Sequence, residues 1–173
     1  SIERAAVFSF SGGRLVETPS TADLPEGVEV ALLSSRGPVS TDGLARLAER
    51  AASVIDNRIA AWHYSSAMHG LFVHVHRNAQ IDQPFVVEYL EIGDGVLAHP
   101  QLYLLVDEGA SITLVRRVRT GDDSLLSNAG IDADIADNAS VDLVSIGDFG
   151  PLTTFFGHES VSLGRDAGLS HFE

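Results

Sequence analysis

Hydrophobic and polar residues alternate along the C-terminal two-thirds of the chain, and this alternation returns in four units of similar length. Each unit contains a small dipeptide that ends in alanine: Asn78-Ala79, Gly109-Ala110, Asn138-Ala139 and Asp166-Ala167. The four alanines are separated by 31, 29 and 28 residues. Apolar residues occupy the positions six and four before each alanine and two after it, namely Val73, Leu104, Ala133 and Val161, then Val75, Val106, Ile135 and Leu163, then Ile81, Ile112, Val141 and Leu169. A repeat of this length with an apolar residue at every second place predicts a β-solenoid.

The residue before each alanine predicts a sharp turn between two strands of each repeat. These residues are asparagine, glycine and aspartate, the types that best tolerate a positive φ angle. Glycine, aspartate and proline also gather at 94–95, 121–123 and 147–151, where we expect longer turns between repeats.

We divide the chain into an N-terminal segment, residues 1–68, and the first coils of the solenoid, residues 69–173. Within the first segment, residues 6–10 and 14–16 predict a small hairpin, and the alternating residues 27–33 predict another strand. Residues 41–62 predict one amphipathic helix, capped by Ser40 or Thr41. Its apolar stripe contains Leu44, Leu47, Ala48, Ala51, Ile55, Ile59 and Trp62.

The outward positions of the repeats change from apolar to polar along the chain. Seven residues before each alanine stand Phe72, Tyr103, Asp132 and Ser160, and five before stand His74, Leu105, Asp134 and Ser162. Because an apolar outer patch needs a cover, we expect the helix to lie over the early coils. The last repeat stops at Glu173, so we expect a truncated piece of a longer protein, or a chain that closes by pairing with another chain.

Composition narrows the class of protein. The chain of 173 residues contains 45% hydrophobic residues, enough for one folded core, and no cysteine. A net charge of −13 gives no basic stripe for nucleic acid. No apolar run approaches the roughly 20 residues that span a bilayer, and the first ten residues do not resemble a signal peptide. We therefore expect a cytoplasmic protein that binds neither nucleic acid nor membrane.

Two histidines, His74 and His76, form an H-x-H on a predicted strand, and His69 and His99 lie nearby in the sequence. Such a pair can begin a metal site, as in the cupin barrels, so a cupin-like metal-dependent enzyme is the alternative interpretation. The two interpretations differ in register. A solenoid places Val73 and Val75 inside and the histidines outside, whereas a barrel places the histidines inside. We favour the solenoid and assign no metal ligand.

The other residues that could suggest a functional site are explained more simply by structural roles. Asp132, Asp134, Asp137 and Asp142 could suggest calcium, but they mostly alternate with apolar residues, as on a solvated strand face. Glu88 and Glu91 could suggest a glycosidase pair, but surface carboxylates explain them more simply. Trp62 fits a packing role. No nucleophile elbow, P-loop or dinucleotide-binding motif is present, so we assign no catalytic and no cofactor-binding residue.

The order of several short motifs resembles the SufB/SufD family of iron–sulfur cluster assembly proteins. The resemblance rests on the run 69–79 (HGLFVHVHRNA) followed by Gln83-Pro84-Phe85, and on the next coil from His99-Pro100 to Glu108-Gly109-Ala110. The N-terminal residues 7–16 and 24–28 look like the start of SufD-type members.

This resemblance implies a right-handed parallel β-helix behind a helical N-terminal segment. It further implies a non-catalytic scaffold subunit, with no cofactor of its own, that pairs with a SufB-type scaffold and a SufC-type ATPase. Self-association through an open β-helix end is a further expectation. Family members are usually more than twice as long, and their ATPase-binding helices and cluster-assembly Cys and His residues lie in a C-terminal part that this chain does not contain. No site residue is therefore carried over.

Overall fold

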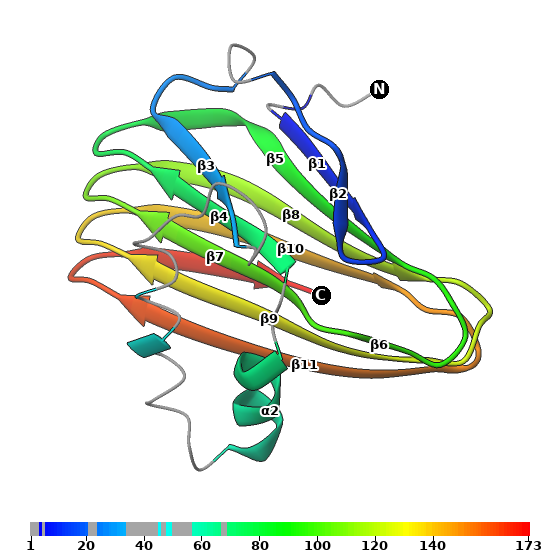
Figure 1. Ribbon diagram of the computed structural model, residues 1–173. Coiled ribbons are helices and arrows are strands. Elements are labelled where there is room, and N and C mark those ends of the chain that lie inside the picture. Colours follow the sequence, from blue (N-terminus) through cyan, green and yellow to red (C-terminus); the bar gives the residue numbers. More distant parts are fainter. Residues whose placement is uncertain are drawn as a thin grey trace.

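The chain forms a parallel β-helix of about four turns, as the repeats predict (Figure 1). The structure, a computed structural model, describes residues 4, 6–20, 24–33, 45, 48–49, 57–66 and 69–173. One sheet, sheet A, has the spatial order β12 (Gly168–Phe172), β10 (Ser140–Asp148), β8 (Ser111–Thr120), β5 (Gln80–Glu91), β1 (Ala6–Ser11) and β2 (Arg14–Glu17). The other, sheet B, has the order β11 (Thr153–Leu163), β9 (Leu125–Ile135), β7 (Pro100–Val106), β4 (His69–Val75) and β3 (Val28–Leu32), with the short β6 (Val96–Ala98) also beside β9.

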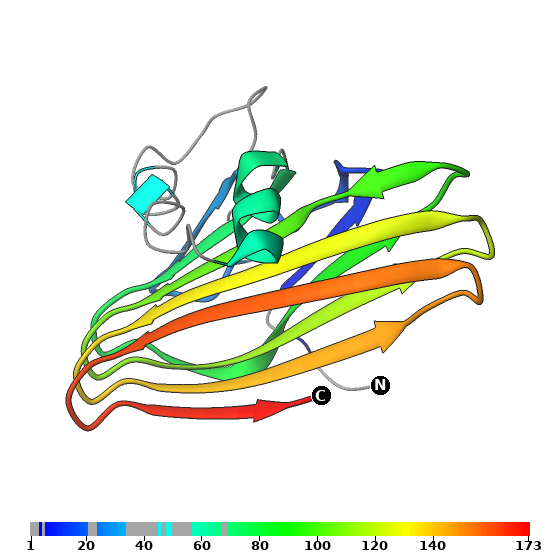
Figure 2. The same ribbon diagram turned by 90° about the horizontal axis from the view of Figure 1, so that it is seen from below.

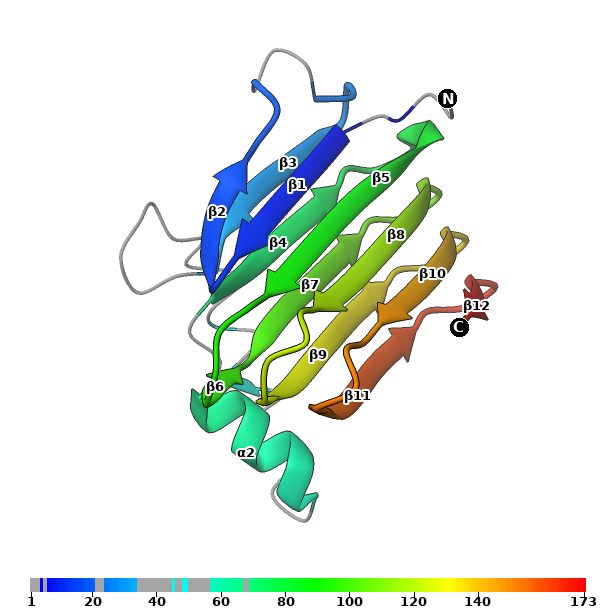
Figure 3. The ribbon, with the colours of Figure 1, turned by 90° about the vertical axis from the view of Figure 1, so that its right-hand side faces the viewer.

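Each coil contributes one strand to each sheet, and the coils stack in parallel register. β4 and β5 form the first coil, and β11 and β12 form the outermost coil at the opposite end of the stack (Figures 2 and 3). Residues predicted at the same outward position of successive coils are register partners in neighbouring strands. Phe72 pairs with Tyr103, Tyr103 with Asp132, and Asp132 with Ser160.

The sharp turns occur where the dipeptides predict them. Asn78, Gly109, Asn138 and Asp166 have φ angles of 60°, 70°, 57° and 55°. Backbone hydrogen bonds also join successive turns; for example, Asn138 N donates to Arg165 O over 2.9 Å. The turn residues therefore serve both the bend and the stacking of coils.

The core lies between the two sheets and contains the predicted inward residues. Val73, Val75 and Val106 have exposed fractions of 0%, and Ile135 has 2%. The register that the solenoid requires is confirmed, and the inward-facing histidine pair that a cupin barrel requires is not observed.

Strands of the N-terminal segment close one end of the stack. β1 runs parallel to β5 and is joined to β2 as the predicted hairpin, while β3 runs antiparallel to β4. Phe8 stacks on Phe85 and Phe10 on Tyr89, with ring centroids 5.4 and 5.0 Å apart. These contacts bury the apolar face of the first coil.

The helix differs from the prediction in its extent. Much of the range 41–62 lies outside the described residues, as do both predicted caps. The described helix α2 (Arg58–Ser66) begins after Asn57, whose side-chain oxygen accepts hydrogen bonds from the backbone N–H groups of Ile59 and Ala60, each 3.1 Å long. Asn57 is an N-cap and is not helical, so a single helix through residue 57 is wrong. None of the described helical residues forms a segment long and apolar enough to span a bilayer.

The part of the predicted helix that lies within α2, residues 58–62, lies nearer the later coils than expected. α2 packs on the outer face of sheet B against β9 and β11 (Figure 2). Its buried residues are Ala60 and His63, and His63 and Tyr64 add polar contacts to sheet B. The outer apolar residues Phe72 and Tyr103 are buried in a small cluster with Leu33.

Candidate functional site

The two ends of the coil stack differ in how far their inward residues are covered. Leu104 and Ala133, in the middle coils, each have 2% of their surface exposed, whereas Val161 at the same place in the outermost coil has 37%. At the inward position two residues further along each coil, Ile135 has 2% of its surface exposed and Leu163 has 52%. The outermost coil therefore presents apolar core positions to the surface.

Two edge strands accompany this apolar surface. Among the described strands, β11 and β12 are each the last of their sheet and pair on one side only (Figure 3). Unpaired strand edges bind other strands, and apolar core positions favour a partner that buries them. We call Val161, Leu163, Leu169 and these two edges the end-coil surface.

The four histidines singled out in the sequence fall into two separate places. His74 and His76 lie on the outer side of β4 and in the turn after it, as the solenoid register predicts. His69 faces inward, and its Nε2 lies 3.5 Å from Oε1 of Glu91, which is 1% exposed. His69 and Glu91, together with His99, line a cavity of about 600 Å³.

Two groups of histidine and carboxylate side chains among the described residues could hold a metal ion. One contains Glu29, His74 and His76, and the other contains Glu159, His171 and Glu173. In each group, one ligand atom per residue lies within 4.8 Å of the others. Sequence reasoning found His74 and His76 but missed Glu29, because β3 is brought beside β4 only by long-range antiparallel pairing.

A buried polar network beneath α2 was also missed by sequence reasoning. His63 is 0% exposed; its Nδ1 lies 2.6 Å from Asn128 O, and its Nε2 lies 2.5 Å from Gln101 Oε1. Gln101 Nε2 donates to Asp132 over 2.8 Å, and the hydroxyl of Tyr64 donates to the same carboxylate over 2.6 Å. We call His63, Tyr64, Gln101 and Asp132 the α2 network. It joins the helix to β7 and β9 through buried polar contacts.

Two further histidines border the α2 network. The ring centroids of His99 and His158 lie 5.8 and 4.7 Å from that of His63. Burial, with a smaller contribution from His63, lowers the pKa of both His99 and His158 to about 4. Burial also lowers the pKa of His63, although its hydrogen bonds oppose this shift. His99 and His158 are therefore neutral at pH 7.

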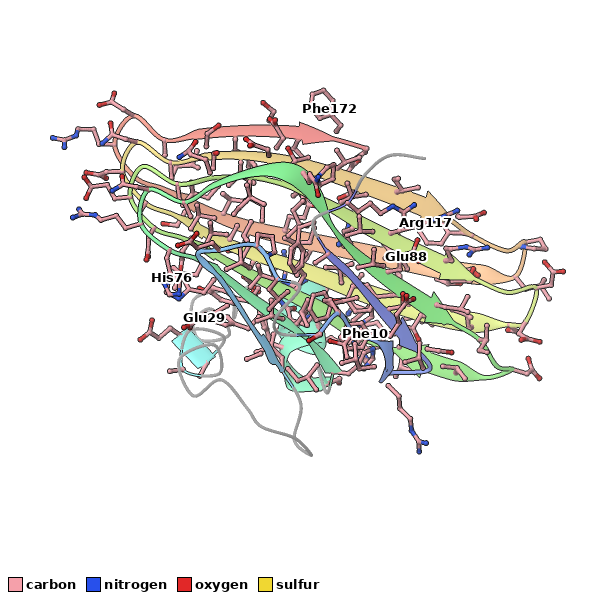
Figure 4. All side chains as sticks on the ribbon, turned by 90° about the horizontal axis from the view of Figure 1, so that it is seen from above. Phe10, Glu29, His76, Glu88, Arg117 and Phe172 are labelled. Atoms are coloured by element: carbon pink, nitrogen blue, oxygen red, sulfur yellow. The ribbon has the colours of Figure 1, made fainter. Side chains whose placement is uncertain are left out.

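The remaining candidates do not assemble into a catalytic or calcium site. Asp132 is fully buried in the α2 network rather than solvated, which corrects the expectation of a solvated strand face at this position. Asp134 accepts a hydrogen bond from Tyr103, and Asp142 lies on the other sheet. Glu88 lies 3.6 Å from Arg117 (Figure 4), whereas Glu91 is buried, which corrects the expectation of a surface carboxylate at this position. The two glutamates therefore point to opposite faces.

Trp62 packs edge-on against His99, with ring centroids 5.2 Å apart, as a structural residue would. Comparison of the sequence with protein-family models and with curated proteins gives no match. The end-coil surface is the feature of the described residues from which we propose a function.

Proposed function

We propose that this chain is a non-catalytic scaffold subunit in iron–sulfur cluster assembly, similar to SufD, and that it binds a SufB-type subunit through the end-coil surface. The order of the motifs along the chain supports the family. The resemblance implies a parallel β-helix behind a helical N-terminal segment, and the parallel β-helix of this chain supports it. The association with a SufC-type ATPase rests on that resemblance alone.

The observation that carries the proposal is the difference between the two ends of the stack. One end is covered by β1, β2 and β3, while the other exposes Val161 and Leu163 at positions that are buried in every other coil. Full burial of such a side chain contributes about 1.5–3 kcal/mol. Strands of another subunit's β-helix satisfy both the apolar positions and the open edges.

The direct test is complex formation between this chain and SufB-type and SufC-type proteins from the same genome, measured by size-exclusion chromatography with light scattering. We expect an equimolar complex with the SufB-type subunit. Leu163→Asp should weaken it, because a charge would replace an apolar contact. Val16→Asp is the matched control, because Val16 is 63% exposed on β2 at the covered end. This variant should bind the SufB-type subunit as the wild type does.

Three results would contradict the proposal. They are no binding of the SufB-type subunit, equal weakening by both variants, and self-association that Leu163→Asp abolishes while the SufB-type subunit fails to bind. The last result would keep the end-coil surface as an interface but remove the proposed partner.

A further inference from the structure

Four side chains from three separate segments meet at one corner of the covered end of the stack. Glu29 comes from β3, His74 from β4, His76 from the turn that follows it, and Asp107 from the turn after β7. Figure 4 shows Glu29 and His76 beside each other at this corner.

Backbone pairing fixes these positions. Glu29 is directly opposite His74 in the antiparallel β3–β4 pair. His76 N donates to Gly27 O over 2.8 Å, and Asp107 N donates to Val75 O over 2.9 Å. The four Cα atoms are therefore held by strands and stacked turns, which position a site more precisely than free loops do.

The side chains converge with the spacing of a loosely preformed metal site. His76 Nε2 lies 3.4 Å from Glu29 Oε1, and the ring centroids of His74 and His76 are 4.3 Å apart. One ligand atom from each of the three residues lies within 4.8 Å of the others. Tetrahedral zinc with bonds of about 2.0–2.1 Å separates its ligands by about 3.3 Å, so modest side-chain rotation closes the site.

We propose that Glu29, His74 and His76 bind one divalent transition-metal ion of the zinc type. Two imidazoles and a carboxylate favour zinc and its neighbours over calcium and magnesium, which prefer oxygen ligands. Asp107 is a positioning residue: its Oδ2 lies 3.0 Å from His74 Nε2, so it accepts a hydrogen bond that orients the ring. The ion joins β3 to the first coil and thereby stabilises the cover of the stack. This site is independent of the proposed function, because the end-coil surface lies at the other end.

The test is a calorimetric titration of chelator-treated, tag-free full chain with ZnCl₂ at pH 7.5. We expect one high-affinity Zn²⁺ per chain and a higher melting temperature in its presence, because a ligand that binds only the folded state stabilises it. Asp107→Asn should weaken binding about 10–100-fold, as removal of an outer hydrogen-bond partner does. His74→Ala and His76→Ala should each weaken binding more than this.

Two variants keep the test decisive if a histidine variant folds poorly. Glu29 has a 73% exposed side chain, so Glu29→Gln removes a ligand without disturbing the core and should also weaken binding. His171→Ala removes a histidine from the other histidine–carboxylate group and should bind Zn²⁺ as the wild type does. The proposal is overturned if the wild type binds no Zn²⁺ in the micromolar range, if Glu29→Gln and His76→Ala bind like the wild type, or if His171→Ala alone removes the ion.

Discussion

Gly130 on β9 is the position where one added methyl group should most clearly disturb the docking of α2. A Cβ atom there would lie 2.5 Å from His63 Nε2 and 2.7 Å from His158 Cε1, and it would also collide with Gln101 Oε1. All three neighbours would have to move, so the contact between His63 and Gln101 would be lost. Overpacking costs about 1–3 kcal/mol, and a buried polar group left unsatisfied costs about 1–3 kcal/mol. Gly130→Ala should therefore destabilise the protein by about 2–6 kcal/mol.

The assay uses Trp62, which lies on α2 and is the only tryptophan in the chain. In Gly130→Ala we expect a red-shifted tryptophan emission from a loosened α2, a β-sheet circular dichroism spectrum that is retained, and a melting temperature lowered by at least about 4 °C. Gly157→Ala is the control, because a Cβ there approaches only the Phe155 ring, at 3.3 Å, and should change stability by less than about 1 kcal/mol. An unchanged emission maximum and melting temperature in Gly130→Ala would refute the reasoning about the α2 network.

Three further predictions concern the core, the turns and the buried histidines. Val106→Asp should prevent folding, judged by circular dichroism, because it buries an uncompensated charge at a fully covered position; native-like melting would contradict the inside–outside assignment. Asn138→Ala should lower stability by about 1–2 kcal/mol in urea unfolding, whereas Asn138→Gly should not, because the φ angle of 57° penalises a β-carbon; equal losses would argue against this cause. Because burial lowers the pKa of His99 and His158 from 6.5 to about 4, the unfolded state binds more protons between these values, and stability should fall as the pH drops from about 6.5 to 4. His158→Gln should flatten that loss, and an unchanged pH dependence would show that His158 is not the responsible group.

The coils and turns could be predicted from the sequence because their signals are local. Alternation fixed the inward register of Val73 and Val75, and the residue types at 78, 109, 138 and 166 indicated positive φ angles that the structure contains. These features depend on neighbours in the same strand or turn.

The position of α2 could not be predicted in this way. A search for an apolar stripe led to the early coils, but the helix is held by hydrogen bonds such as that between Tyr64 and Asp132, 68 residues apart in the chain. The position of Asp132 on a predicted strand does not indicate that Tyr64, far away in the sequence, will cover it and donate a hydrogen bond to it. The contribution of Glu29 to the histidine pair is hidden for the same reason, since it depends on which strand pairs with β4.

The central claim, that the end-coil surface binds a SufB-type subunit, is tested most directly by hydrogen–deuterium exchange of this chain with and without that subunit. We expect slower exchange concentrated in the backbone amides of β11 and β12, the two strands of the outermost coil. Exchange in β1 and β2, at the covered end of the stack, should stay unchanged. Slower exchange in β1 and β2 with none in β11 and β12, or no change anywhere, would contradict the account.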